Sequence, residues 1–261
     1  MPSVSVNGIN LFYDEQNPND LEDTVVFLHG AGGNHMSWWQ QVPTFREQYR
    51  CISVDQRGFG RSLDPSGEEV ARFTDDLEAL LDELDIERAA LVAQSMGGRS
   101  ALGFAVRSPE RVRALVMADT WGFFDWPELQ ARVTELREAQ SNPNAPLTDR
   151  ALGSDFQVNN PAGTFLYRQI FDLNPPRAPQ QPLTEGAPSK ADVEGLAVPS
   201  MFLVGSEDAL TPPEILRAVH KIVPGSKFVE VPGCGHSVYF EQPDTFNEIV
   251  GGFLADQFGA A

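Results

Sequence analysis

Four short apolar runs with no alternating polar face constrain the fold of this 261-residue chain more than any other feature. They lie at 24–28, 89–93, 112–118 and 200–205, and helix-like stretches such as 69–84 lie between them. A strand that is apolar on both sides is typical of a parallel sheet whose two faces are covered by helices. The alternation therefore predicts an α/β fold.

Weaker patterns extend this predicted sheet. Further strands are expected at 3–6, 10–14, 51–55 and 227–231. Together the strand candidates predict a mostly parallel eight-stranded sheet with helices on both faces. The helices are expected at 36–49, 69–84, 96–106, 127–140, 163–173, after Pro212 and Pro213, and at 244–257.

The alternation of strands and helices stops between residues 121 and 196. This stretch contains two of the predicted helices and a proline-rich segment at 175–190 that has no need to pack. Alternation resumes after it. We therefore expect 1–120 and 197–261 to form one α/β core, with 121–196 as an inserted helical lid.

The net charge of −18 excludes several classes of partner. Nucleic-acid binding needs a basic surface, and an anionic membrane surface would repel such an acidic chain. No apolar run approaches the length of a membrane span, the N-terminus lacks a secretory pattern, and two cysteines are too few for a disulfide framework. We expect a cytoplasmic protein without metal or cofactor that acts on a small molecule, with a homodimer left open.

Ser95 is the strongest candidate for a reactive side chain, because LVAQSMGG at 91–98 places it between a predicted buried strand and a predicted helix. A serine hydroxyl is a weak nucleophile at neutral pH and must be presented rigidly beside a base. A strand-turn-helix elbow does this, and it needs small residues two before and two after the serine, where Ala93 and Gly97 occur. Glycine is usual at the first position, so Ala93 is a mild departure. A serine that merely caps the helix is the alternative.

Two backbone N–H groups are candidates for an oxyanion hole. The N–H of Met96 would lie at the N-terminus of the predicted helix, where the helix dipole favours negative charge. The N–H of Ala31 lies in FLHGAGGN at 27–34, whose glycines allow a substrate to approach the main chain closely. A turn that only ends the preceding strand is the other interpretation of His29 and Gly30.

With these motifs in view, the chain resembles the α/β-hydrolase superfamily, in particular its small bacterial esterases, enol-lactonases and cofactor-free haloperoxidases. The order and spacing of the matching segments make the resemblance specific, and they are spread along nearly all of the chain outside the insertion. The segments are HGAGG at 29–33, DQRGFGRS at 55–62, AQSMGG at 93–98, GSEDALTPP at 205–213 and GCGHSVYFEQP at 233–243.

The resemblance implies the other two members of a catalytic triad. In this family the acid follows a late strand as Gly-x-x-Asp, which matches Asp208, and the base follows a glycine near the C-terminus, which matches His236. Asp208 would hold His236 in the tautomer that accepts the Ser95 proton. Glu207 and Asp119 remain as rival acids. In DQRGFGRS, the charges of Asp55 and Arg57 are expected to be buried structural partners rather than catalysts, because charges inside a fold need pairing.

Residues 121–196 fall where this superfamily inserts a lid above the nucleophile. The segment is rich in aromatic side chains, most of which are expected to pack the insertion onto the core. Trp121, Phe123 and Phe124 are candidates for lining a small, largely apolar substrate pocket. Arg168 is a candidate for binding a substrate carboxylate, although an exposed arginine on a helix is the commoner outcome.

Taken together, these features predict a cofactor-free serine hydrolase that cleaves small esters or lactones through an acyl-enzyme. Perhydrolysis by the same acyl-enzyme, seen as haloperoxidase activity, is an alternative. Carbon-carbon bond hydrolases of ring-cleavage products also resemble the chain at Ser-Met-Gly-Gly, but they usually show asparagine and tryptophan where this chain has Gln94 and Ser237. A non-catalytic ligand receptor is less favoured, because a pure binder has no need for a general base.

Overall fold

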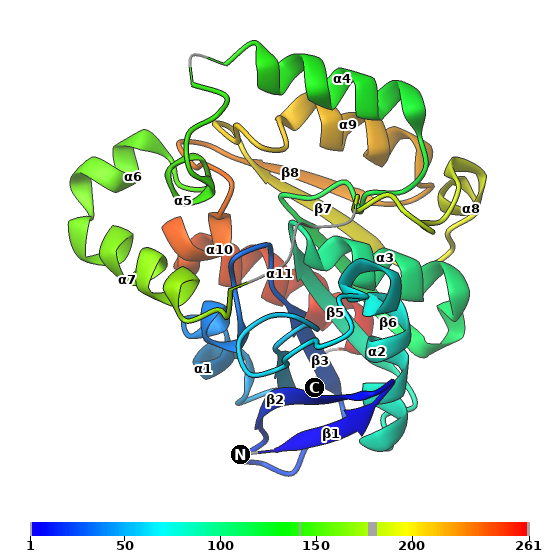
Figure 1. Cartoon of the computed structure of the whole chain (residues 1–261). Coiled ribbons are helices and arrows are strands. Elements are labelled where there is room, and N and C mark those ends of the chain that lie inside the picture. Colours follow the sequence, from blue (N-terminus) through cyan, green and yellow to red (C-terminus); the bar gives the residue numbers. More distant parts are fainter. Residues whose placement is uncertain (1, 141, 177–181, 260–261) are drawn as a thin grey trace.

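A computed structural model of the chain describes residues 2–140, 142–176 and 182–259. Within these residues the strands form an eight-stranded sheet in the order β1-β2-β4-β3-β5-β6-β7-β8 (Figure 1). From β4 to β8 in this order all neighbours are parallel, whereas β2 is antiparallel to both β1 and β4. The predicted mostly parallel α/β sheet is confirmed. The strands are β1 (Ser3–Val6), β2 (Ile9–Gln16), β3 (Thr24–Leu28), β4 (Arg50–Val54), β5 (Ala89–Gln94), β6 (Val112–Ala118), β7 (Ser200–Gly205) and β8 (Lys227–Val231).

The first two strands form a hairpin through a two-residue turn. Val6 pairs with Ile9, so Asn7 and Gly8 alone make the connection, and both have positive φ, 45° and 81°. An Asn-Gly pair suits such a turn because both residues tolerate the left-handed region. The hairpin adds an antiparallel edge to the parallel sheet.

Helices cover both faces of the sheet, and successive strand residues point to opposite sides. Val26 and Leu28 pack with α2, α3 and α9 in one cluster, while Val25 and Phe27 pack with α1, α10 and α11 in the other. No helix in the described ranges is long and apolar enough to cross a membrane. The elements outside the insertion are η1 (His35–Trp38), α1 (Val42–Phe45), α2 (Glu69–Glu83), α3 (Gly97–Arg107), η2 (Pro109–Arg111), α9 (Pro213–Ile222), α10 (Val238–Glu241) and α11 (Pro243–Phe258).

The expected single helix at 36–49 is wrong. The chain instead forms a turn of 3₁₀ helix, η1, and then the separate short helix α1. Asn34 caps η1 through its side chain, and Pro43 stands in the first turn of α1, where its missing N–H costs nothing. The amphipathic pattern across this stretch therefore arises from two short elements that face the same core.

The inserted segment, residues 121–196, connects β6 to β7 and divides into two parts (Figure 1). The helix α4 packs beside α9, whereas α7 packs against η1. Residues 177–181 of the proline-rich stretch lie outside the described residues. The helices of the segment are α4 (Pro127–Glu138), α5 (Leu147–Arg150), α6 (Ser154–Asn159), α7 (Pro161–Asp172) and α8 (Lys190–Glu194).

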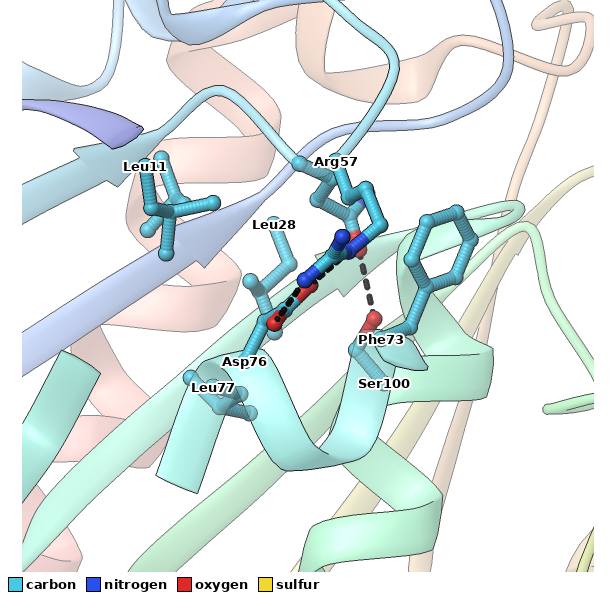
Figure 2. A pocket seen from close by; sticks show the side chains of 9 residues that line it. Leu11, Leu28, Arg57, Phe73, Asp76, Leu77 and Ser100 are labelled. Atoms are coloured by element: carbon cyan, nitrogen blue, oxygen red, sulfur yellow. Dashed lines mark hydrogen bonds and ion pairs between the residues drawn. The ribbon is translucent and has the colours of Figure 1, made fainter. Parts of the chain in front are cut away.

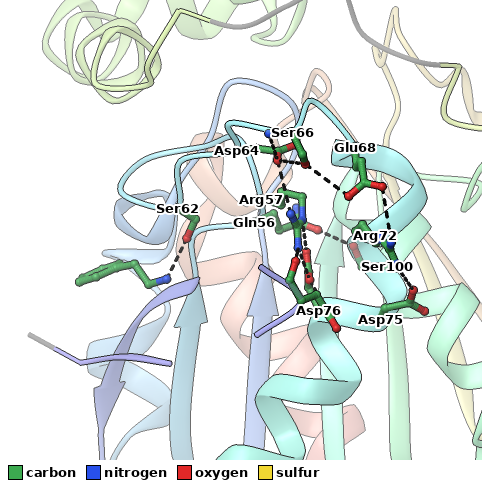
Figure 3. A network of polar contacts seen from close by, with 12 residues as sticks. Gln56, Arg57, Ser62, Asp64, Ser66, Glu68, Arg72, Asp75, Asp76 and Ser100 are labelled. Carbon is green, nitrogen blue, oxygen red and sulfur yellow. Dashed lines mark hydrogen bonds and ion pairs between the residues drawn. The ribbon is translucent and has the colours of Figure 1, made fainter. Parts of the chain in front are cut away.

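Arg57 is the centre of a buried polar network beside the sheet (Figure 3). Its Nε and Nη2 donate to the two carboxylate oxygens of Asp76 at 2.7 and 2.8 Å, and its Nη1 lies 3.4 Å from Asp64. Figure 2 shows the Arg57–Asp76 pair beside Leu28 and Leu77. These residues line a void of about 10 Å³. Asp55 is also buried, but its partner is His35, at 2.8 Å. Each charge is therefore paired inside the fold.

Candidate active site

Ser95 lies in the sharp turn between β5 and α3. Its φ is 48°, a left-handed conformation that a residue with a side chain adopts only under strain. The turn needs a glycine at 97, because a Cβ there would lie 2.2 Å from the carbonyl oxygen of Leu28. These contacts bring the start of α3 against the end of β3, and the Ser95 side chain is held at the edge of the sheet where the parallel strands end.

His236 contacts Ser95 from the turn between β8 and α10. The Nε2 atom of His236 lies 2.8 Å from the Oγ atom of Ser95, and the His236 side chain is buried. The Nδ1 atom lies 2.8 Å from Oδ2 of Asp208 and 2.9 Å from Oδ1. With the proton on Nδ1, the ring donates to Asp208 and its Nε2 is free to accept the Ser95 proton.

Asp208, in the loop after β7, is the carboxylate that contacts His236. Its Oδ1 also accepts the backbone N–H groups of Leu210 and Thr211, both at 2.8 Å, so the carboxylate is fixed in place. Glu207 is exposed. The sequence left three acids open, and the structure brings only Asp208 within hydrogen-bond distance of the ring.

Asp119, the other rival acid, is buried behind Asp208 at the end of β6. It accepts the N–H groups of Gly205 at 3.0 Å and Val238 at 3.3 Å. Burial, together with the neighbouring charge of Asp208, raises the pKa of Asp119 well above its ordinary value. Asp119 therefore joins the ends of β6 and β7 to the start of α10 as a carboxyl group that resists ionisation.

Ala31 and Met96, whose N–H groups are the candidate oxyanion donors, lie close to Ser95 in the chain or in space. Met96 follows Ser95 directly, and Ala31 follows Gly30, where a Cβ would lie 2.9 Å from the Cβ of Ser95. Leu28 of β3 pairs with Ala93 of β5, so the loop after β3 and the turn after β5 leave the sheet side by side. Among the described residues neither N–H has a hydrogen-bond acceptor. Two unpaired backbone donors beside a serine can stabilise a developing oxyanion.

Gln94 and Asn174 hold this site together, and neither role could be predicted from a sequence pattern. The Gln94 side chain donates to the main-chain oxygen of His236 at 2.8 Å. Asn174 follows α7 and donates through Nδ2 to the Gly32 oxygen at 2.7 Å, while its Oδ1 accepts the Gly60 N–H at 2.8 Å. The inserted segment thereby contacts the same loop that carries Ala31. A single amide at the end of a strand or after a helix is part of no periodic pattern, so only the fold shows which atoms it reaches.

A pocket of about 490 Å³ opens beside the Ala31 loop. The ring of Phe171 packs against Gly32, where a Cβ would lie 2.3 Å from it. Of the described residues that line the pocket, only Asp172 is charged. The lining residues are Ala31, Gly32, Phe59, Leu147, Phe171, Asp172, Asn174, Pro175 and Pro176.

The four residues expected to form a substrate pocket lie elsewhere. Trp121, Phe123 and Phe124 are buried in the cluster that joins α3 to α4, and they do not line the 490 Å³ pocket. Arg168 is exposed and forms an ion pair with Asp149 at 3.1 Å. The aromatic side chains thus pack the start of the insertion onto the core, and a role for any of the four in binding substrate stays a prediction.

Comparison with known proteins gives consistent matches along the chain. A family model described as the alpha/beta hydrolase family matches residues 25–249. A 2-hydroxy-6-oxo-2,4-heptadienoate hydrolase from Pseudomonas putida is 29% identical over 247 residues, covering 88% of each chain. A thermophilic esterase from Thermogutta terrifontis superposes with a TM-score of 0.83 at 27% identity, covering 98% of this chain and 99% of the esterase. Est816, described as an N-acyl homoserine lactone degrading enzyme, superposes with a TM-score of 0.79 at 25% identity, covering 97% and 100%.

Proposed function

Because the chain belongs to the alpha/beta hydrolase family, we propose that it is a serine hydrolase that cleaves small, largely apolar carboxylic esters or lactones. The observation that carries the proposal is the unbroken chain of hydrogen bonds from Ser95 through His236 to Asp208. This is the arrangement that a serine needs to become a nucleophile at neutral pH. The likeness to an esterase and to a lactone-degrading enzyme supports the same reaction class.

In the proposed reaction, Oγ of Ser95 attacks the substrate carbonyl while Nε2 of His236 takes its proton. The negative charge on the carbonyl oxygen is stabilised by the N–H groups of Ala31 and Met96. His236 then returns the proton to the leaving alcohol, and the acyl-enzyme remains. Water, deprotonated by His236, releases the acid and restores Ser95. Asp208 stabilises the imidazolium in both steps.

The pocket supports an uncharged substrate with a small acyl or alcohol group. Phe59, Leu147 and Phe171 give it an apolar wall close to the Ala31 loop. Asp172 places a carboxylate at the same pocket and would repel an anionic group. Inserted residues contribute much of the wall, so we assign the segment 121–196 the role of a lid.

Carbon-carbon bond hydrolysis by the same serine is the second candidate, favoured by the 29% identity to the heptadienoate hydrolase. The substrate named for that relative is an anion. In this chain Arg168 forms an ion pair with Asp149, and the carboxylate of Asp172 lines the pocket. These charges disfavour an anionic dienoate and favour an uncharged ester or lactone as the substrate.

The test combines active-site labelling with a substrate panel. Wild type treated with a fluorophosphonate should carry one adduct on Ser95, mapped by mass spectrometry, whereas Ser95→Ala should carry none. Ser95→Ala should lower kcat on p-nitrophenyl esters by about 10⁴-fold or more. Ser66→Ala, which changes an exposed serine, is the matched control. Retained activity in Ser95→Ala would mean that another group is the nucleophile, and a preference for a ring-cleavage dienoate over esters and lactones would favour the second candidate.

A further inference from the structure

Glu241, the last residue of α10, holds the two residues on either side of His236. It is buried, and its Oε2 accepts the N–H of Gly235 at 3.1 Å while its Oε1 accepts the N–H of Ser237 at 3.3 Å. Both donors belong to the turn that carries the proposed base. The carboxylate therefore fixes the main chain immediately before and after His236.

The same carboxylate also contacts the inserted segment. Its Oε2 accepts the N–H of Gly153, between α5 and α6, at 3.0 Å. The two glycine backbones touch, because a Cβ on Gly235 would lie 2.4 Å from the nitrogen of Gly153. A Cβ on Gly153 would lie 2.8 Å from Oε2 of Glu241. The insertion is thus seated directly on the His236 turn, with Glu241 joining the two.

No lysine or arginine among the described residues forms an ion pair with Glu241. Burial, with the charge of Asp208, raises the pKa of Glu241, and the three backbone N–H groups act in the opposite direction. In the described residues the carboxylate is therefore held by three backbone N–H groups, those of Gly153, Gly235 and Ser237.

We propose that Glu241 is a positioning residue for His236 and makes the placement of the base depend on the docking of the inserted segment. The inference rests on the proposed function, in which His236 is the general base. Asp208 fixes the ring and Gln94 fixes the main-chain oxygen of His236. Glu241 binds the main chain on either side of His236, at Gly235 and Ser237, and is the only one of these three side chains that also binds the insertion.

The test compares Glu241→Gln, Glu241→Asp and the control Glu248→Gln, which removes the same charge from an exposed position on α11. Each is assayed on an uncharged p-nitrophenyl ester from pH 5 to 9, with thermal unfolding recorded in parallel. Glutamine keeps the size of the side chain but loses the charge and turns one acceptor into a donor. Aspartate keeps the charge but is one methylene too short to reach all three N–H groups.

We expect Glu241→Gln to lower kcat about tenfold to a hundredfold with KM within about twofold, the cost of a misplaced catalytic group. The loss should fall on kcat and not on KM, because the base is displaced while the pocket wall is unchanged. Glu241→Asp should also lower kcat, and Glu248→Gln should change neither kcat nor KM.

Two outcomes would overturn the inference. One is a wild-type kcat in folded Glu241→Gln, and the other is failure of both Glu241 variants to fold, which would make the residue a support of the fold alone. Failure of the proposed function looks different. In that case wild type itself would not be labelled on Ser95 and would not hydrolyse the ester.

Discussion

Replacing Asn174 by leucine should weaken both the fold and the proposed reaction, because Asn174 ties the inserted segment to the loop of Ala31. Leucine has a similar size but neither donates nor accepts a hydrogen bond. The variant loses the bonds to the Gly32 oxygen and from the Gly60 N–H, at 2.7 and 2.8 Å. The loop that carries Ala31, one of the two proposed oxyanion donors, then loses its hydrogen bond to the inserted segment.

The size of the effect follows from these two bonds. Gly32 and Gly60 are half-buried, so water can replace part of what is lost. At about 0.5–1.5 kcal/mol for each hydrogen bond, the free energy of unfolding should fall by about 1–3 kcal/mol. Complete loss of an oxyanion donor costs about 10²–10³ in kcat, and a displaced donor should cost less, about tenfold.

Urea unfolding followed by tryptophan fluorescence measures the first quantity, and kcat on a p-nitrophenyl ester measures the second. Asn159→Leu is the matched control, because it makes the same chemical change at an exposed position in the same segment. It should leave both quantities near wild type. A kcat of Asn174→Leu within twofold of wild type would refute the idea that this side chain positions the oxyanion loop.

Two further predictions concern buried charges. Arg57→Met should lower the free energy of unfolding by about 3–5 kcal/mol, because the carboxylates of Asp76 and Asp64 lose the cation with which they are paired. Urea unfolding measures this loss, and a value below about 1 kcal/mol would contradict the importance of this buried network. Asp119→Asn should gain stability relative to wild type as the pH rises above about 4, measured by unfolding from pH 4 to 8. The pKa of Asp119 is raised above its ordinary 3.8 by burial and by the charge of Asp208. The folded state therefore binds this proton more tightly than the unfolded state, and wild type loses the stability that the proton provides as the pH rises toward the folded-state pKa, whereas asparagine has no proton to lose. A stability difference that does not change with pH would contradict this reasoning.

The centre of the sheet could be predicted because β3, β5, β6 and β7 are apolar on both faces. Parallel strands of one sheet have their carboxyl ends at the same edge. Ser95 follows β5, Asp208 follows β7 and His236 follows β8, so all three lie at that edge. The resemblance to α/β hydrolases, together with the place of these motifs after the strands, therefore predicted which residues could meet. The choice of Asp208 over Asp119 could not be made this way, since both follow strands of the same sheet.

The contacts of the insertion could not be read from the sequence. Gln94, Asn174 and Glu241 each reach a main-chain atom that is distant in the sequence, in His236, Gly32 and Gly153 respectively, and no periodic pattern marks them. The helices α5, α6 and α8 contain 4, 6 and 5 residues, too few to show a helical repeat. Burial of Trp121 likewise depends on where α4 packs, which is a tertiary property.

The inserted segment touches the proposed machinery at several points, among them Gly153 and Tyr167 against the His236 turn and Asn174 against the Ala31 loop. The twenty residues between Gly153 and Asn174, 154–173, include Phe171, which lines the pocket. Mutations elsewhere in that interval can accumulate and reshape the pocket wall while Gly153, Tyr167 and Asn174 keep their contacts with the proposed machinery. For laboratory evolution of substrate range, this divides the insertion into an interval to randomise and three positions to leave alone.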